Sequence, residues 1–187
     1  MAQTHTGKSK SKRTSTRKAS SGGKDAIQLL KADHREVEDL FKKFQNASGQ
    51  DKKWQIAQQI CNELKIHAMI EEEIFYPTFE GRIDDDLYHE AYVEHDGAKV
   101  LINDIMASGG DGEFFDAKVT VLCEEIDHHV QEEEKPGEGF FSQARDTGID
   151  MVELRDRMMA RKEELMAQAE SEGLPPAQMA AIQVQMA

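Results

Sequence analysis

The chain has 187 residues, of which 39% are hydrophobic and 32% are charged, and its formal net charge is −13. These values are typical of one globular domain with a heavily charged surface. No apolar run approaches the roughly 18 residues of a membrane helix, and no apolar segment follows the basic N-terminal residues as it would in a secretory signal, so we expect a cytoplasmic protein.

The first 24 residues differ in charge from the rest of the chain. Residues 1–24 contain seven Lys or Arg and no Asp or Glu, whereas the remainder contains 16 basic and 36 acidic residues. A basic, Ser- and Thr-rich segment without large apolar side chains predicts a disordered tail that aids solubility. The alternative role is a weak, salt-sensitive contact with nucleic acid or another polyanion, which the acidic body would oppose.

Beyond residue 24, apolar residues recur at three- and four-residue steps, as on the buried face of an amphipathic helix. No segment alternates as a strand does. Four main helices are expected, over residues 25–46, 51–79, 84–107 and 112–134. Helices of this length with short connections predict an all-α, antiparallel up-down-up-down four-helix bundle, and we assign the bundle domain to residues 25–146.

The remaining chain, residues 147–187, is assigned to an additional C-terminal helix and a tail. A glycine-containing loop is expected over residues 136–148, and residues 149–169 again have an amphipathic pattern. This helix is predicted to pack either on the bundle or against a second copy. Residues 173–187 predict a loose tail or a short terminal helix. Cys61 and Cys123 lack a CxxC spacing and are predicted to be small buried side chains.

Polar residues on an apolar stripe are the most informative feature of the four helices. Each predicted helix carries one histidine there, namely His34, His67, His95 and His129. One such histidine would be typical of a satisfied core side chain. One on each of four antiparallel helices predicts that all four meet in a common region of the bundle core.

Two of these histidines have a glutamate four residues later. Glu71 follows His67 and Glu133 follows His129, a spacing that places both side chains of each pair on one helix face. Two carboxylates that point into one core require a cation, because a buried charge without a partner costs several kcal/mol. The alternative, that the glutamates face solvent, is disfavoured by their positions on the apolar stripes.

Two further histidines on the helices are predicted to lie outside the site. His128 is adjacent to His129, but its stripe is half charged, whereas the stripe of His129 is apolar up to the site. We therefore assign His129 as the ligand and His128 to an outer contact or to solvent. His89 lies six residues before His95, about 240° round the helix, and is expected at the surface or its boundary.

The type of ligand narrows the choice of metal. Four imidazoles and two carboxylates are too many for one tetrahedral zinc and too rich in nitrogen for calcium or magnesium. They suit two iron or manganese ions in a bundle core. The ferritin-like pattern needs two Glu-x-x-His motifs, and only the segment from Glu125 to His128 matches it. The pair of His-x3-Glu motifs is therefore the stronger signal.

Four separated motifs occur in order: 25–35 (including Asp33-His34-Arg35), 67–77, Glu94-His95, and 128–134. Together they resemble the hemerythrin-like (HHE cation-binding) domains of bacteria, over about residues 25–145. The resemblance implies an antiparallel four-helix bundle with an oxo- or hydroxo-bridged di-iron centre that meets O2 or its reduced products. It implies two bridging carboxylates, Glu71 and Glu133. The terminal ligands that it implies are His34, His67, His95 and His129.

The sequence departs from the oxygen-carrying hemerythrins at one point. Those proteins share two histidines four residues apart on the third helix. In this chain, the residue four positions before His95 is Ala91, and the residue four positions after it is Lys99. The centre is then completed by water, by a nearby residue such as Tyr92 or Glu94, or left open. This departure weakens the case for simple reversible O2 carriage.

Three functions fit these expectations. The first is a non-enzymatic di-iron protein that binds O2, a related diatomic molecule or a reactive oxygen species for sensing, storage or delivery. The second is a di-iron enzyme of oxidative or nitrosative stress that acts on peroxide or nitric oxide. The third is an iron-holding or structural protein whose tail or fifth helix docks a partner.

Overall fold

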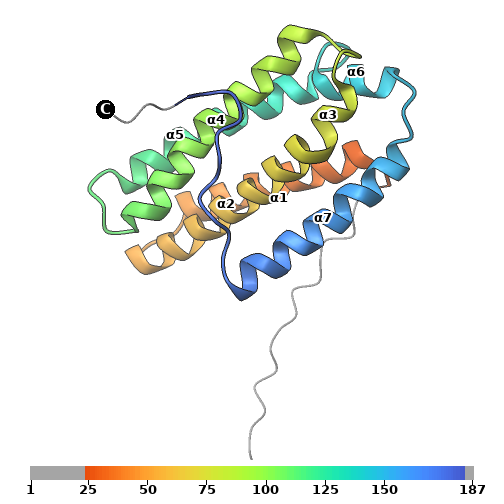
Figure 1. The fold of residues 1–187 in the computed structure, drawn as a ribbon. Helices are drawn as coiled ribbons and strands as arrows, with labels where there is room; N and C mark the ends of the chain where they lie inside the picture. Colours follow the sequence, from red (N-terminus) through yellow and green to blue (C-terminus); the bar gives the residue numbers. More distant parts are fainter. Residues whose placement is uncertain (1–23, 184–187) are drawn as a thin grey trace, which may run out of the picture.

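The computed structural model describes residues 24–183, so the predicted tail over residues 1–24 lies almost entirely outside the described residues. The described chain forms helices and turns without a β-strand (Figure 1). Its elements are α1 (Ala26–Gln45), α2 (Gln50–Ile70), η1 (Glu71–Phe75), α3 (Tyr76–Phe79), α4 (Asp85–Ser108), α5 (Phe115–Glu134), α6 (Phe140–Asp146) and α7 (Met151–Ser171).

Aspartate side chains set the start of three of these helices. The carboxylate of Asp25 accepts a hydrogen bond from the backbone N–H of Gln28 at the start of α1. Asp84 and Asp150 cap α4 and α7 in the same way, each accepting from two backbone N–H groups. Each cap satisfies donors that would otherwise have no partner and contributes about 1 kcal/mol.

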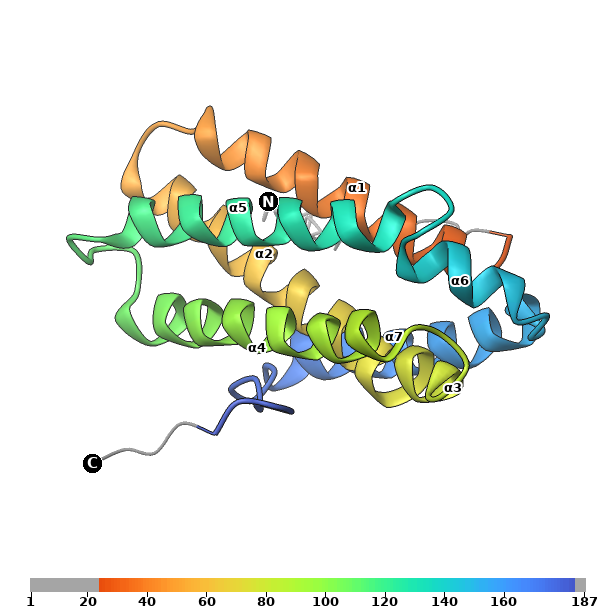
Figure 2. The ribbon, with the colours of Figure 1, turned by 90° about the horizontal axis from the view of Figure 1, so that it is seen from above.

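The helices α1, α2, α4 and α5 form the predicted antiparallel four-helix bundle, and α7 is the additional C-terminal helix (Figure 2). Neighbouring helices around the bundle are α1 with α2, α2 with α4, α4 with α5, and α5 with α1. The helix α7 packs against α1 and α2, which agrees with the first of the two placements expected for it.

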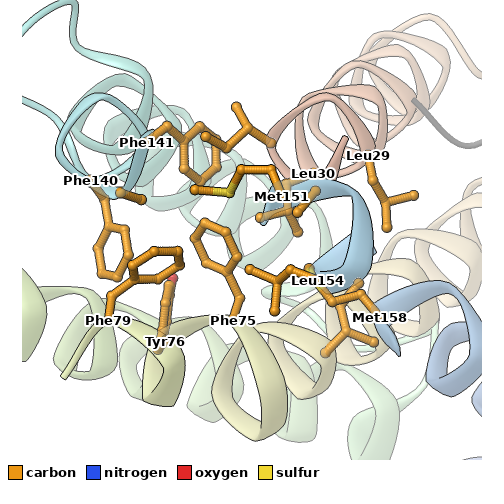
Figure 3. Close-up of a cluster of buried hydrophobic side chains, with 14 of the residues drawn as sticks. Leu29, Leu30, Phe75, Tyr76, Phe79, Phe140, Phe141, Met151, Leu154 and Met158 are labelled. Carbon is orange, nitrogen blue, oxygen red and sulfur yellow. The ribbon is translucent and has the colours of Figure 1, made fainter. Parts of the chain in front are cut away.

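The apolar core consists of two clusters, one towards each end of the bundle. One cluster joins the C-terminal half of α1 and the N-terminal half of α2 to the facing halves of α4 and α5. The other joins the start of α1 to η1, α3, α6 and α7, where Phe75, Phe79 and Phe140 pack with Leu154 and Met158 (Figure 3). The predicted site residues lie in the layer between the two clusters.

Two expectations about the C-terminal third are wrong. The predicted loop over residues 136–148 contains a short helix, α6, because Phe140 and Phe141 bury their rings in the core. A seven-residue helix is too short to show a clear period. The turn before it requires Gly139, because a Cβ there would meet the carbonyl oxygen of Glu132 at 2.3 Å.

The segment after α7 is neither a helix nor loose over its described part. It runs from the end of α7 across α2 to α4 (Figure 1). Lys65 on α2 donates to the carbonyl of Leu174, and the Asn103 side chain on α4 both donates to and accepts from the backbone of Ala177. We call residues 174–182 the strap.

The strap ends on one buried carboxylate. Asp96 on α4 is fully buried and accepts hydrogen bonds from the backbone N–H groups of Ala180, Ala181 and Ile182. Most strap side chains are exposed, so these backbone contacts, rather than apolar burial, hold the segment in place. Within residues 24–183, no helix is both long enough and apolar enough to cross a membrane.

Candidate metal centre

Four helices each bring one buried histidine to the layer between the apolar clusters. His34 comes from α1, His67 from α2, His95 from α4 and His129 from α5, and none is more than 6% exposed. The rings form two pairs. Nε2 of His34 lies 3.1 Å from Nε2 of His67 in the first pair, and Nε2 of His95 lies 3.1 Å from Nε2 of His129 in the second.

Both glutamates of the two His-x3-Glu motifs reach both histidine pairs. Oε2 of Glu71 lies 3.1 Å from Nε2 of His67 in the first pair and 3.4 Å from Nε2 of His95 in the second. Oε2 of Glu133 lies 3.3 Å from Nε2 of His34 in the first pair and 3.6 Å from Nε2 of His129 in the second. Each carboxylate therefore stands between two groups of imidazole nitrogens, as a ligand shared by two ions would.

A ring of four carboxylates surrounds the histidines on the side away from the core. The contacts run between neighbouring helices: Asp33 with His67, Glu72 with His95, Glu94 with His129, and Glu134 with His34. Three of the carboxylate oxygens lie 2.7–2.8 Å from Nδ1, and the contact of Asp33 is longer at 3.6 Å. The three close partners fix the proton on Nδ1 of His34, His95 and His129 and leave Nε2 of each ring free to bind a metal.

The fit of a cation is tested by the polar atoms that have no partner. Among the described residues, the buried side-chain atoms without a hydrogen-bond partner are Oδ2 of Asp33, Nδ1 of His67, Oε1 of Glu71 and Oε2 of Glu133. The atoms of Asp33 and His67 face each other at 3.6 Å in the outer ring, whereas the two glutamate oxygens belong to the centre itself. Buried carboxylate oxygens are rarely left unpaired, so this concentration indicates a place for a positive ion.

The protonation of the centre supports the same conclusion. Burial alone would raise the pKa of Glu71, but the charge of His67 and hydrogen bonds with His67 and His95 hold that pKa well below its ordinary value. Burial lowers the pKa of His67 and of His95, but the nearby carboxylates outweigh burial and raise the pKa of His67 to about 10 and that of His95 to about 9. Protons thus balance the carboxylates, and a bound metal ion would displace them.

One residue of the centre was not predicted from the sequence. The hydroxyl of Tyr76 donates to Oε1 of Glu133 at 3.0 Å and lies 3.2 Å from Nε2 of His95 and 3.4 Å from Oε2 of Glu71. Burial and the charges of the two glutamates raise the pKa of Tyr76 well above its ordinary value. Its hydroxyl therefore stays protonated and acts as a hydrogen-bond donor inside the centre.

A wide helical turn explains why Tyr76 reaches the site. The backbone N–H of Tyr76 donates to the carbonyl of Glu71, five residues earlier, which makes η1 a π-helical turn. In a regular α-helix a residue five positions on would lie about 140° round the axis. The wide turn returns Tyr76 to the face of Glu71. Such turns often occur at functional sites.

The other residues that the sequence singled out lie outside the space between the histidine pairs. His128 is exposed and contacts Glu94, and His89 is exposed on α4, so both lie outside the centre. Glu94 faces Nδ1 of His129 rather than the space between the histidine pairs. The hydroxyl of Tyr92 lies 3.4 Å from that of Tyr88. Of the aromatic residues near His95, it is Tyr76 whose hydroxyl enters the centre.

Comparison with known proteins assigns the family. A sequence model of the hemerythrin HHE cation-binding domain matches residues 25–136, which is more than half of the chain. The chain therefore belongs to the hemerythrin HHE cation-binding domain family. Membership implies binding of a metal cation. Two groups of buried residues fit such a site, because the ligand atoms within each group lie within 4.8 Å of one another. One group is His34, His67, Glu71 and Glu133, and the other is Glu71, His95 and His129.

Two individual proteins are similar to the chain. One is a hemerythrin HHE cation-binding domain-containing protein from Mycobacterium kansasii, whose crystal structure superposes on this chain with a TM-score of 0.66. The superposition covers 80% of this chain and 94% of the Mycobacterium kansasii chain, at 20% sequence identity, and it shows the shared fold. A protein of Nostoc sp. named DNA nickase is 29% identical over 106 residues, 57% of this chain. The match spans 30% of the length of that relative.

Proposed function

We propose that the centre holds two iron ions. His34 and His67 hold one, His95 and His129 hold the other, and two carboxylates reach both. The observation that carries this proposal is that Glu71 and Glu133 each contact one histidine of each pair. Imidazole and carboxylate ligands in a bundle core suit iron, whereas a single zinc would use only four of the six groups.

The proposed use of the centre is to bind O2, a related diatomic molecule or a reactive oxygen species for sensing, storage or delivery. Bound iron would supply the electrons that such molecules take up when they bind. The protein supplies orientation, because outer carboxylates fix the Nδ1 protons of His34, His95 and His129. It also keeps bulk water out, because the apolar clusters lie on both sides of the centre.

A second candidate is an enzyme that consumes peroxide or handles nitric oxide. The observation that favours it is the hydroxyl of Tyr76, a hydrogen-bond donor 3.0 Å from Oε1 of Glu133 inside the centre. Reduction of peroxide develops negative charge on the reacting oxygen, and a fixed hydrogen-bond donor inside the centre stabilises such charge. The same hydroxyl also serves a carrier as a hydrogen-bond donor, so the two candidates are separated by kinetics.

Metal analysis tests the proposal. Protein purified without chelators is expected to contain about two irons per chain, because four histidines and two shared carboxylates suit two ions in a bundle core. His129→Ala removes one histidine of the second pair and is expected to lower the iron content to about one. His128→Ala is the matched control, because His128 is exposed, and it should keep the full content. Zinc alone, or no transition metal, would overturn the proposal.

Stopped-flow mixing of the reduced protein distinguishes carrier from enzyme. A stable adduct with O2 that is lost under vacuum supports binding and delivery. Turnover of peroxide without a lasting adduct supports the enzyme. Tyr76→Phe is expected to slow the second reaction much more than the first, because it removes the hydrogen-bond donor and keeps the ring.

A further inference from the structure

The centre opens onto a cavity of about 240 Å³ that leads outwards between α2 and α4 to the strap. The four histidines lie at its inner end, and its outer end is lined by Pro175, Pro176, Ala177 and Gln178. Between the two ends the wall is apolar and comes from all four bundle helices: Val37, Leu64, Ala98, Ile102, Ile126 and Val130.

The volume of this cavity exceeds what a diatomic molecule requires. An apolar cavity of about 150 Å³ in a protein interior is large enough to bind benzene. The cavity here is larger and has apolar walls between two polar ends. Such a space fits the apolar part of an organic molecule of moderate size.

The charged side chains that line the cavity are paired, with one exception. Asp33 pairs with Lys162, Glu72 with Lys99, and Glu73 with Arg161, and Lys99 also pairs with Asp96. Among the described residues, Lys65 makes no ion pair, and its ammonium group donates to the neutral carbonyl of Leu174 at 3.1 Å.

Lys65 is only 6% exposed, although lysine is seldom buried without a partner. An ammonium group on a largely buried side chain gains little from a single carbonyl and favours an anion. Its carbonyl partner belongs to the strap, so the ammonium lies at the outer end of the cavity. The unpaired positive charge thus stands at one end of the apolar wall, and the histidines stand at the other.

We infer that the cavity binds an amphipathic monocarboxylate, with its carboxylate on Lys65 and its apolar chain against Leu64, Ala98 and Ile102, directed towards the histidines. The molecule would enter when the strap leaves Asn103 and Asp96, because the strap covers the outer end. This inference goes beyond the proposed function and does not depend on the metal that the centre holds.

Calorimetric titration of the metal-free, full-length protein tests the inference. The probes are straight-chain monocarboxylates of four to ten carbons and the primary alcohols of the same lengths, in the presence of a chelator. We expect one molecule per chain, with an optimum of chain length, and at least about tenfold weaker binding of the matched alcohol, since the alcohol cannot pair with Lys65. This comparison requires no variant.

Two variants locate the binding site. Lys65→Met keeps most of the side-chain volume and is expected to reduce carboxylate affinity to that of the alcohol, while Lys52→Met, at an exposed lysine of the same helix, should leave it unchanged. Ala98→Leu fills the wall and is expected to weaken both probes. Undetectable carboxylate binding, equal affinity of acid and alcohol, or unchanged affinity in Lys65→Met would each overturn the inference. Iron content, measured separately, decides the proposed function on its own.

Discussion

Removing a single oxygen atom from Tyr76 should weaken the centre without changing its shape. Tyr76 is fully buried, and its ring packs against Phe140. Tyr76→Phe keeps that ring and removes the hydroxyl that donates to Oε1 of Glu133 at 3.0 Å. The other oxygen of this carboxylate, Oε2, already lacks a hydrogen-bond partner. The buried carboxylate would therefore lose a donor that water cannot replace.

A hydrogen bond to a charged, buried acceptor contributes about 1.5–3 kcal/mol. We therefore expect the free energy of unfolding of the metal-free protein to fall by about 2 kcal/mol, which corresponds to roughly 4–8 °C in melting temperature for a domain of this size. Loss of a group that positions metal ligands typically lowers metal affinity by about 10- to 100-fold, and we expect the same here.

Urea unfolding followed by circular dichroism measures the first effect, and metal titration against a competing chelator measures the second. Tyr92→Phe is the matched control, because its hydroxyl lies 3.4 Å from that of Tyr88 and does not reach the centre. If Tyr76→Phe and Tyr92→Phe change stability and metal affinity equally, the assignment of Tyr76 to the centre is wrong.

Three further predictions concern other parts of the molecule. Saturation with metal at about 100 times its dissociation constant should stabilise the fold by about 2.7 kcal/mol and raise the melting temperature by roughly 5–11 °C; no shift would mean that the centre binds none of the metal tested. Burial raises the pKa of Cys61 to about 12, and burial with nearby carboxylates raises that of Cys123 to about 11. Because each thiolate fraction at pH 8 is then small, iodoacetamide should react at least about 100-fold more slowly with the folded chain than with the urea-unfolded chain, and equal rates would contradict this. Deleting residues 1–24 should abolish any salt-sensitive binding of the chain to DNA, measured by fluorescence anisotropy at rising salt, whereas unchanged binding would remove the tail as its cause.

The sequence by itself determined the bundle and the six residues that converge in it. Period-3.6 stripes fix which face of each helix is buried, so a histidine on each stripe must point into the core. The same reasoning separated His129 from His128, whose side chains lie about 100° apart on α5. The structure confirms the fold and brings the six side chains together, because antiparallel packing places the centres of four stripes side by side.

The outer ring of carboxylates depends on which helices are neighbours. A residue next to a core-facing one lies about 100° round its helix and so points towards an adjacent helix. Asp33 and Glu94 precede a histidine of their own helix, whereas Glu72 and Glu134 follow a glutamate. Because direction alternates between antiparallel neighbours, all four turn the same way round the bundle. In the sequence alone they are indistinguishable from solvated charges.

Tertiary structure alone decided the place of Tyr76, the cavity and the strap. Stripe analysis assumes 100° per residue, and the π-helical turn at η1 breaks that assumption between Glu71 and Tyr76. The strap has no periodic pattern of apolar residues, and its hydrogen bonds with Asp96 and Asn103 join residues that are more than 70 positions apart in the sequence. Local pattern fixes which side chains face inwards, whereas the contacts that close and complete the centre arise only between segments that folding brings together.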